Sequence, residues 1–151
     1  MYEAKLKEMG LDLPEAPKPL AAYVPAIQAG DLVYTSGQIP LVGGELKFKG
    51  QVGAEISEAQ GYEAAKVCAV NCLSAIKGLI GSLDRIDHIV KVTGFVNSAP
   101  GFSAQPKIVN GASELLGQVF GGAGGHARSA VGVSALPLDS AVEVELVVKL
   151  K

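Results

Sequence analysis

Two stretches of the chain carry apolar residues at three- and four-residue steps, which is the spacing of a helix with one buried face. The first stretch opens on Ser57-Glu58-Ala59-Gln60, a capping-box pattern, and is expected to be helical to about Ser82. The second is expected to run from a capping residue, Ser103, to Phe120, with Gly121 ending it. Each helix therefore offers one apolar stripe to the rest of the fold.

Alternating or β-branched residues predict the strands. In the last strand, valines and a leucine alternate with Glu143 and Glu145, so one face is apolar and the other partly polar. The order along the chain is β-β-β-α-β-α-β-β, so two helices and about six strands are expected. The expected strands are Tyr23–Ala29, Leu32–Ser36, a short one near Leu46–Phe48, Ile89–Val96, Ala127–Leu136 and Ala141–Leu150.

Two helices can cover only one face of such a sheet, so the other face needs a different cover. The balance of 48% hydrophobic and 19% charged residues is apolar for a small monomer and favours burial against further copies of the chain. Within the 151 residues we expect an N-terminal arm at 1–19, with a helical turn at Tyr2–Met9 and several prolines, and a single domain at 20–151.

Charge and composition exclude some partners. The net charge of -2, the absence of Trp and an aromatic content of 5% argue against a nucleic-acid binder. No apolar run reaches a membrane span and the first residues lack a secretory pattern, so a cytoplasmic protein is expected. Cys68 and Cys72 stand four apart on one helix, and a metal site there would need further ligands, so both are interpreted as small core residues.

Candidate chemistry gathers near the C-terminus around Arg128. It is one of two arginines, the other being Arg85, and it follows the glycine-rich run of residues 121–125. A lone guanidinium at the start of an apolar strand is costly to bury unless an anion lies beside it. Two interpretations fit this position. Arg128 forms a structural ion pair with Glu143 or Glu145, or it binds an external anion.

Several motifs resemble those of the Rid/YjgF family of enamine/imine deaminases. Ser36–Pro40 reads SGQIP, which is similar to a signature of that family. Ala127–Ser129 reads ARS and is followed by VEVE at Val142–Glu145, which resembles the C-terminal signature in sequence and spacing. Tyr23 precedes the first motif at the family's distance, and Asn110 resembles the asparagine of its second helix. The resemblance covers nearly the full chain.

This resemblance implies an α+β, chorismate-mutase-like fold, with a mixed sheet of about six strands and two helices on one face. It also implies assembly as a homotrimer, with three sites at the subunit clefts. It implies hydrolysis of reactive 2-imino or 2-enamino acids to 2-keto acids and ammonia, without a cofactor or metal. Arg128 would bind the substrate carboxylate, because a planar guanidinium offers two parallel N–H bonds. Glu143 would position or deprotonate the attacking water, or pass its proton to the leaving nitrogen.

The remaining pocket would be formed largely by backbone groups, which Gly37 and the start of the Arg128 strand can bring close to a substrate. For Tyr23 the alternative is plain packing, and for Asn110 it is hydrogen bonding within the helix. The residues expected to bind substrate are Tyr23, Gly37, Asn110, Ala127, Ser129 and Ala130.

The chain also departs from familiar Rid proteins. His126 stands where they usually carry proline, and is interpreted either as an acid/base or as a simple loop histidine. The preceding glycine run is expected to be longer and more flexible, and Ala130 replaces a cysteine found in some members. Two other functions therefore stay open, a non-catalytic binder of small carboxylates or keto acids and, against the charge balance, a ribonuclease or translation inhibitor.

Overall fold

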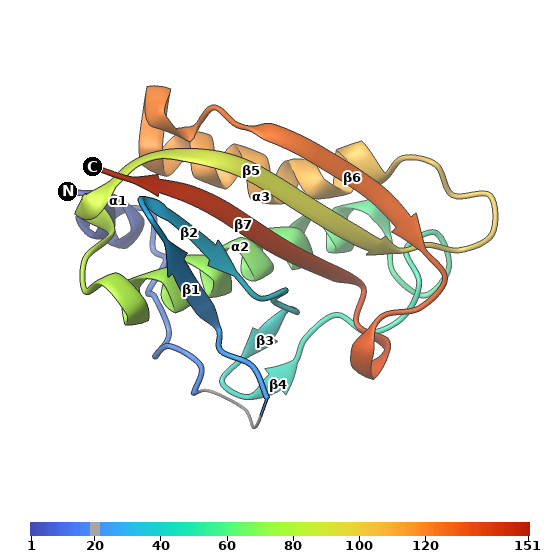
Figure 1. Cartoon of the computed structure of the whole chain (residues 1–151). Helices are drawn as coiled ribbons and strands as arrows, with labels where there is room; N and C mark the ends of the chain where they lie inside the picture. The colour runs from blue at the N-terminus through green and yellow to red at the C-terminus, as the bar shows by residue number, and fades with distance from the viewer. Residues whose placement is uncertain (19–21) are drawn as a thin grey trace.

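A five-stranded mixed sheet forms the centre of the protein in the computed structural model, which describes residues 1–18 and 22–151. The strand order is β1-β2-β7-β5-β6, and only β5 and β6 run parallel. The helices α2 (Glu58–Ile80) and α3 (Gln105–Phe120) pack side by side on one face (Figure 1). The strands are β1 (Ala26–Ala29), β2 (Leu32–Thr35), β5 (Ile86–Asn97), β6 (Ala127–Val133) and β7 (Val142–Leu150). The α+β fold with two helices on one face is confirmed.

The sheet has five strands where about six were expected. The strand predicted near Leu46–Phe48 belongs instead to a separate hairpin of β3 (Leu41–Val42) and β4 (Glu45–Leu46). Pro40 has no N–H for a ladder, and the glycines at 43 and 44 turn the chain back on itself before it can join the main sheet. The two C-terminal strands are also not paired with each other, because β5 lies between β6 and β7.

The start of α2 follows the sequence pattern, whereas the start of α3 does not. The Ser57 hydroxyl accepts from the Gln60 N–H at 3.1 Å, and the Gln60 side chain accepts from the Ser57 N–H at 2.9 Å, which confirms the capping box. The prediction that Ser103 caps α3 is wrong, since Ala104 takes that position without a side-chain bond. Pro106 in the first turn fixes where this helix begins.

The core lies between the helices and the sheet, and it includes the contact of α2 with β7. Cys68 and Cys72 are fully buried there, with their thiols 3.5 Å and 3.2 Å from the carbonyl oxygens of Val142 and Val144. Burial raises the pKa of Cys68 well above its usual range and that of Cys72 to about 12. The interpretation of both cysteines as small core residues is confirmed.

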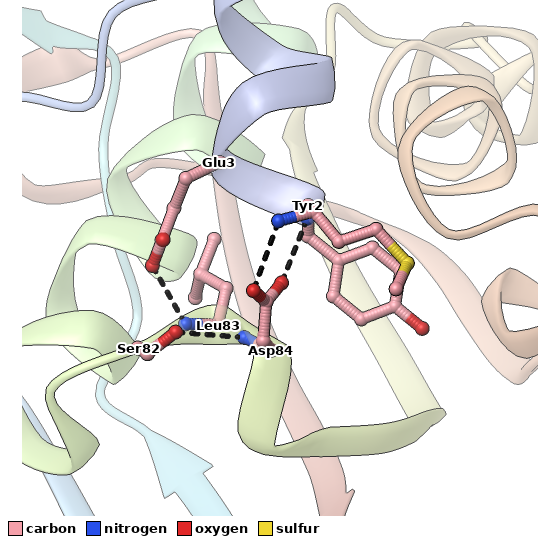
Figure 2. A network of polar contacts seen from close by, with 6 residues as sticks. Tyr2, Glu3, Ser82, Leu83 and Asp84 are labelled. Atoms are coloured by element: carbon pink, nitrogen blue, oxygen red, sulfur yellow. Dashed lines mark hydrogen bonds and ion pairs between the residues drawn. The ribbon is translucent and has the colours of Figure 1, made fainter.

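The N-terminal helix α1, which spans Tyr2–Glu8, is tied to the turn before β5 by a network of polar contacts (Figure 2). The Asp84 carboxylate accepts from the Tyr2 N–H at 2.8 Å and from the chain's terminal ammonium at 2.9 Å. In return, the Glu3 carboxylate accepts from the Leu83 N–H at 2.8 Å. The helical turn predicted in the arm is therefore present, and its first residues are fixed by charge-assisted bonds.

Apolar contacts hold α1 against the end of α3. Leu6 is buried, and the ring of Tyr2 lies 4.4 Å from that of Phe120, centroid to centroid. The arm thus extends the helix layer. The boundary expected between arm and domain, at residues 19 and 20, lies outside the described residues.

The face of the sheet opposite the helices is left open within the described part of the chain (Figure 1). It exposes Ile27 and Tyr34, a cross-strand pair of β1 and β2, and Val131 of β6, at 58%, 43% and 42%. An uncovered sheet face with exposed apolar side chains is typical of a surface that packs against another protein surface. No helix among the described residues is long and apolar enough to cross a membrane.

Candidate functional site

Arg128 lies on the edge strand β6 and turns its half-buried side chain toward α3. Its NH1 group donates to the Asn110 Oδ1 at 2.8 Å and to the Ser113 Oγ at 3.3 Å. No ion pair among residues 1–18 and 22–151 involves Arg128, so the interpretation as an ion pair with Glu143 or Glu145 is wrong for this chain. The guanidinium is bonded to neutral groups and keeps its charge available for an external anion.

A second layer of contacts lies behind the arginine. The His126 Nε2 is 2.9 Å from the Ser113 Oγ, and its Nδ1 is 2.6 Å from the carbonyl oxygen of Gly124. The sequence interpretation had overlooked Ser113, although its place three residues after Asn110 sets both on one helix face, which was an available signal. Asn110, Ser113, His126 and Arg128 are called the cationic group below.

The glycine run before β6 packs closely and does not loop out. It forms one 3-10 turn, η2, over Gly121–Gly124, and Gly124 is buried. A Cβ at Gly124 would lie 2.5 Å from the carbonyl oxygen of Leu116 in α3, so no larger residue fits. This packing holds in place the Gly124 carbonyl that lies within hydrogen-bond distance of His126 Nδ1.

The SGQIP segment passes beside β7 and carries Gly37 over Glu143. Gln38 and Val144 exchange two backbone hydrogen bonds of 2.8 Å and 3.0 Å, which fix the segment against the strand. A Cβ at Gly37 would lie 2.8 Å from the Glu143 carboxyl carbon. Only a glycine leaves room for this approach to the Glu143 side chain, and the backbone contact of Gly37 with a substrate stays a prediction.

The Glu143 carboxylate is half-buried and forms no hydrogen bond within the described chain. Its burial, and then the charge of Glu145 two residues on, raise its pKa above the ordinary value of a glutamate. Tyr23 lies near this segment, because the Ser36 hydroxyl donates to the carbonyl of Val24 at 2.6 Å. Tyr23 itself is 58% exposed. Tyr23, Gly37 and Glu143 are called the carboxylate group below.

The structure does not join the cationic and carboxylate groups within one chain. Glu143 alternates with the buried Val142 and Val144, so it projects from the open face, whereas Arg128 bonds to α3 on the helix face. Strand β5 separates them as well, since Val92 lies opposite Arg128 and Phe95 lies opposite Glu143.

The backbone residues predicted to bind substrate lie on the edge strand of the cationic side. Ala127, Ser129 and Ala130 pair with Lys91, Thr93 and Gly94 of β5 on one side only. Some of their backbone N–H and C=O groups therefore point away from the sheet, where they are free to hydrogen-bond to a ligand. No set of three His, Cys, Asp or Glu side chains gathers to hold a metal ion anywhere in the described ranges.

Residues 3–150 match the profile of a protein family described as "YjgF/chorismate_mutase-like, putative endoribonuclease". The chain is 43% identical to Protein TCP17 of Trypanosoma cruzi over 97% of its length and 92% of that protein. It is 30% identical to a 2-iminobutanoate/2-iminopropanoate deaminase of Dermatophagoides farinae over 93% of its length and 95% of that protein.

A solved structure is similar along the whole chain. The protein Atu1372 of Agrobacterium tumefaciens, described as being of unknown function, is 42% identical and superposes with a TM-score of 0.93, over 99% of this chain and 92% of the other. At that level of likeness the two proteins share the fold.

Proposed function

The chain belongs to the YjgF (RidA) family, and on that premise we propose that it hydrolyses reactive 2-imino and 2-enamino acids to 2-keto acids and ammonia. The observation that carries the proposal is the half-buried Arg128 guanidinium, whose partners in the described chain are all neutral. A planar donor of this kind matches a carboxylate, which it binds through two parallel N–H bonds. The activity is that named for the relative of Dermatophagoides farinae.

In the proposed reaction Arg128 holds the substrate carboxylate and so fixes the position of the imine carbon. Glu143 accepts a proton from a water that adds to this carbon, and the proton passes to the nitrogen. In the resulting adduct the hydroxyl hydrogen then passes to the nitrogen, the C–N bond breaks, ammonia leaves and the C=O bond of the keto acid forms. The raised pKa of Glu143 suits this role, since a group that takes and returns a proton works best near the ambient pH.

We further propose that the site forms between copies in a homotrimer. A cyclic contact would set the cationic group of one copy against the carboxylate group of the next and so create three equal sites. The exposed Ile27, Tyr34 and Val131 on the open face supply an apolar surface for this contact. Light scattering behind a sizing column measures the mass. A monomer that turns over substrate would contradict the shared site.

The activity is tested with 2-aminoacrylate released by a serine dehydratase, by following pyruvate formation with and without the protein. We expect the wild-type protein and an Arg85→Ala control to accelerate pyruvate release, and Arg128→Ala to lose the acceleration. Arg85 is a matched control because its guanidinium bonds to the Ile80 carbonyl at 3.0 Å, away from the site. If folded wild-type protein accelerates the hydrolysis of no 2-imino acid, the proposal is rejected.

A second candidate function uses the same site to bind keto acids without turnover. It is favoured by the Glu143 carboxylate, which forms no hydrogen bond in the described chain and so has no partner in the same copy to orient it for proton transfer. Calorimetry with 2-oxobutyrate separates the two. Binding that Arg128→Ala abolishes, together with no turnover, would select the binder.

A ribonuclease activity finds less support in the chain. Its net charge is -2 and it holds two arginines, so the electrostatic attraction to a phosphate backbone is weak. RNA cleavage by nuclease-free Arg128→Ala protein would nevertheless establish such an activity independently of the site described above.

A further inference from the structure

We propose that Ser113 and His126 are positioning residues that occupy one end of the Arg128 guanidinium and reserve its Nε–NH2 edge for the substrate carboxylate. This inference rests on the proposed function and says how the arginine is presented to its ligand. It starts from the two hydrogen bonds of NH1, which go to Asn110 and Ser113.

The first step concerns the protonation of His126. The carbonyl of Gly124 can only accept, so the Nδ1 atom that lies 2.6 Å from it must carry a hydrogen. In the neutral imidazole the other nitrogen, Nε2, is then an acceptor. The Ser113 hydroxyl lies 2.9 Å from Nε2 and therefore donates its single hydrogen to it.

The second step concerns Ser113. Once its hydrogen points at His126, its oxygen presents lone pairs to the other side, where Arg128 NH1 lies at 3.3 Å. The bonds thus run in one direction, from Arg128 through Ser113 and His126 to the backbone of the glycine turn. Gly124 is buried so close to the backbone of Leu116 that not even a Cβ would fit between them, which limits its movement. The chain of bonds, called the brace here, ends on a fixed point.

The third step counts the donors of the guanidinium. Of its five N–H groups, the two of NH1 are taken by Asn110 and Ser113, and the described residues accept no hydrogen bond from the other three. A carboxylate needs two parallel donors, which a guanidinium offers along the NH1–NH2 edge or the Nε–NH2 edge. The occupied NH1 removes the first edge, so the substrate is expected on the second.

The direct test uses the two arginines as reporters. In protein labelled with 15N-arginine, the Nε–H signals of Arg85 and Arg128 are assigned with an Arg85→Lys variant. Addition of 2-oxobutyrate is expected to move the Arg128 Nε–H signal and to leave that of Arg85 in place. Binding that leaves the Arg128 Nε–H signal unmoved would overturn the inference, whereas the proposed function would stand.

The brace itself is tested by substitution. Ser113→Ala and His126→Leu are each expected to weaken 2-oxobutyrate binding about 5- to 10-fold, the loss of roughly one hydrogen bond. The double variant should bind like either single one, because both break the same chain of bonds. His126→Gln keeps an acceptor for Ser113 and should recover most of the affinity, and His88→Gln is the matched control without effect.

The outcomes separate the two proposals. If wild-type protein binds no keto acid and deaminates no imino acid, the proposed function is wrong, and the inference that the brace presents Arg128 to a carboxylate is wrong with it. If wild-type protein binds 2-oxobutyrate, and Ser113→Ala and His126→Leu bind it equally well, the brace alone is wrong. Circular dichroism of each variant verifies the fold, and the labelling experiment on unsubstituted protein does not depend on it.

Discussion

The cationic and carboxylate groups differ in how completely one chain builds them. On the cationic side, Arg128 is fixed by two side chains of α3 and a histidine behind them, with 2.6 Å to 3.3 Å contacts throughout. On the carboxylate side, Glu143 touches the backbone of Gly37 but donates and accepts nothing in the described chain. The Arg128 guanidinium is therefore oriented by hydrogen bonds before any ligand binds, whereas the Glu143 carboxylate is held only by packing.

This difference indicates that the hydrogen-bond partner of Glu143 comes from outside its own chain. A half-buried carboxylate without a hydrogen bond is unfavourable, and its raised pKa shows that cost. In the proposed trimer the cationic group of a neighbour, or the water and substrate between them, would supply the partner. The four predictions that follow break or sharpen this comparison, from the largest effect to the smallest.

Glu143→Gln should separate chemistry from binding. Loss of the proton acceptor is expected to lower kcat about 10²- to 10³-fold, the usual contribution of general acid–base catalysis. The Kd for 2-oxobutyrate should change by no more than about threefold, because Arg128 carries the affinity. Steady-state assays and calorimetry on the same preparation check both. A large loss of binding would show that Glu143 orients the ligand itself.

Mixed trimers test whether the two groups come from different copies. Arg128→Ala and Glu143→Gln chains should each be nearly inactive alone. Unfolded and refolded together in equal amounts, they should recover about a quarter of the wild-type rate, since one pairing in four joins an intact arginine with an intact glutamate. A mixture of Arg128→Ala with Arg128→Lys serves as the control. No recovery above that control would mean that one chain supplies both residues.

Gly37→Ala should displace Glu143 without unfolding the chain. The added methyl would lie 2.8 Å from the Glu143 carboxyl carbon, and this flexible side chain can swing aside. We expect kcat to fall about tenfold as the carboxylate leaves its position. Gly30→Ala is not a suitable control because of its positive φ, whereas Gly117→Ala, with open space around it, is. Unchanged turnover would separate Gly37 from the site.

Glu145→Gln should move the acid side of the pH profile. The charge of Glu145 contributes to the raised pKa of Glu143, so its removal lowers that pKa. Activity that needs the Glu143 carboxylate is lost as pH falls through this pKa. The acid limb of kcat/KM should therefore lie at lower pH in the variant, with little change at pH 7. A limb that stays in place would assign the titration to another group.

Local sequence patterns predicted the single helices and strands of this fold better than they predicted which strands lie next to each other. Ser57 and Gln60 marked the start of α2, because a capping box acts within four residues. The alternation around Glu143 correctly set which residues of β7 are buried. Strand order was not accessible in this way. A short link joins β6 and β7 along the chain, yet β5 lies between them in the sheet, parallel to β6 and antiparallel to β7.

The candidate site shows the same division. The family motifs placed Arg128 and Asn110 in one predicted pocket, and the structure adds that the two side chains meet at 2.8 Å. The contact of Ser113 with His126 could not be read in advance, because it depends on a turn of five small residues folding back on α3. Glycines can adopt many conformations, so their sequence does not say which one tertiary packing will select.

The two thiols between α2 and β7 have a practical consequence. Cys68 and Cys72 are protonated and sealed from solvent, so a maleimide can react with them only after the helix has moved off the strand. The rate of alkylation in the native protein, followed by mass spectrometry, therefore measures how often these layers separate. The unaltered chain thus contains its own probe of local opening.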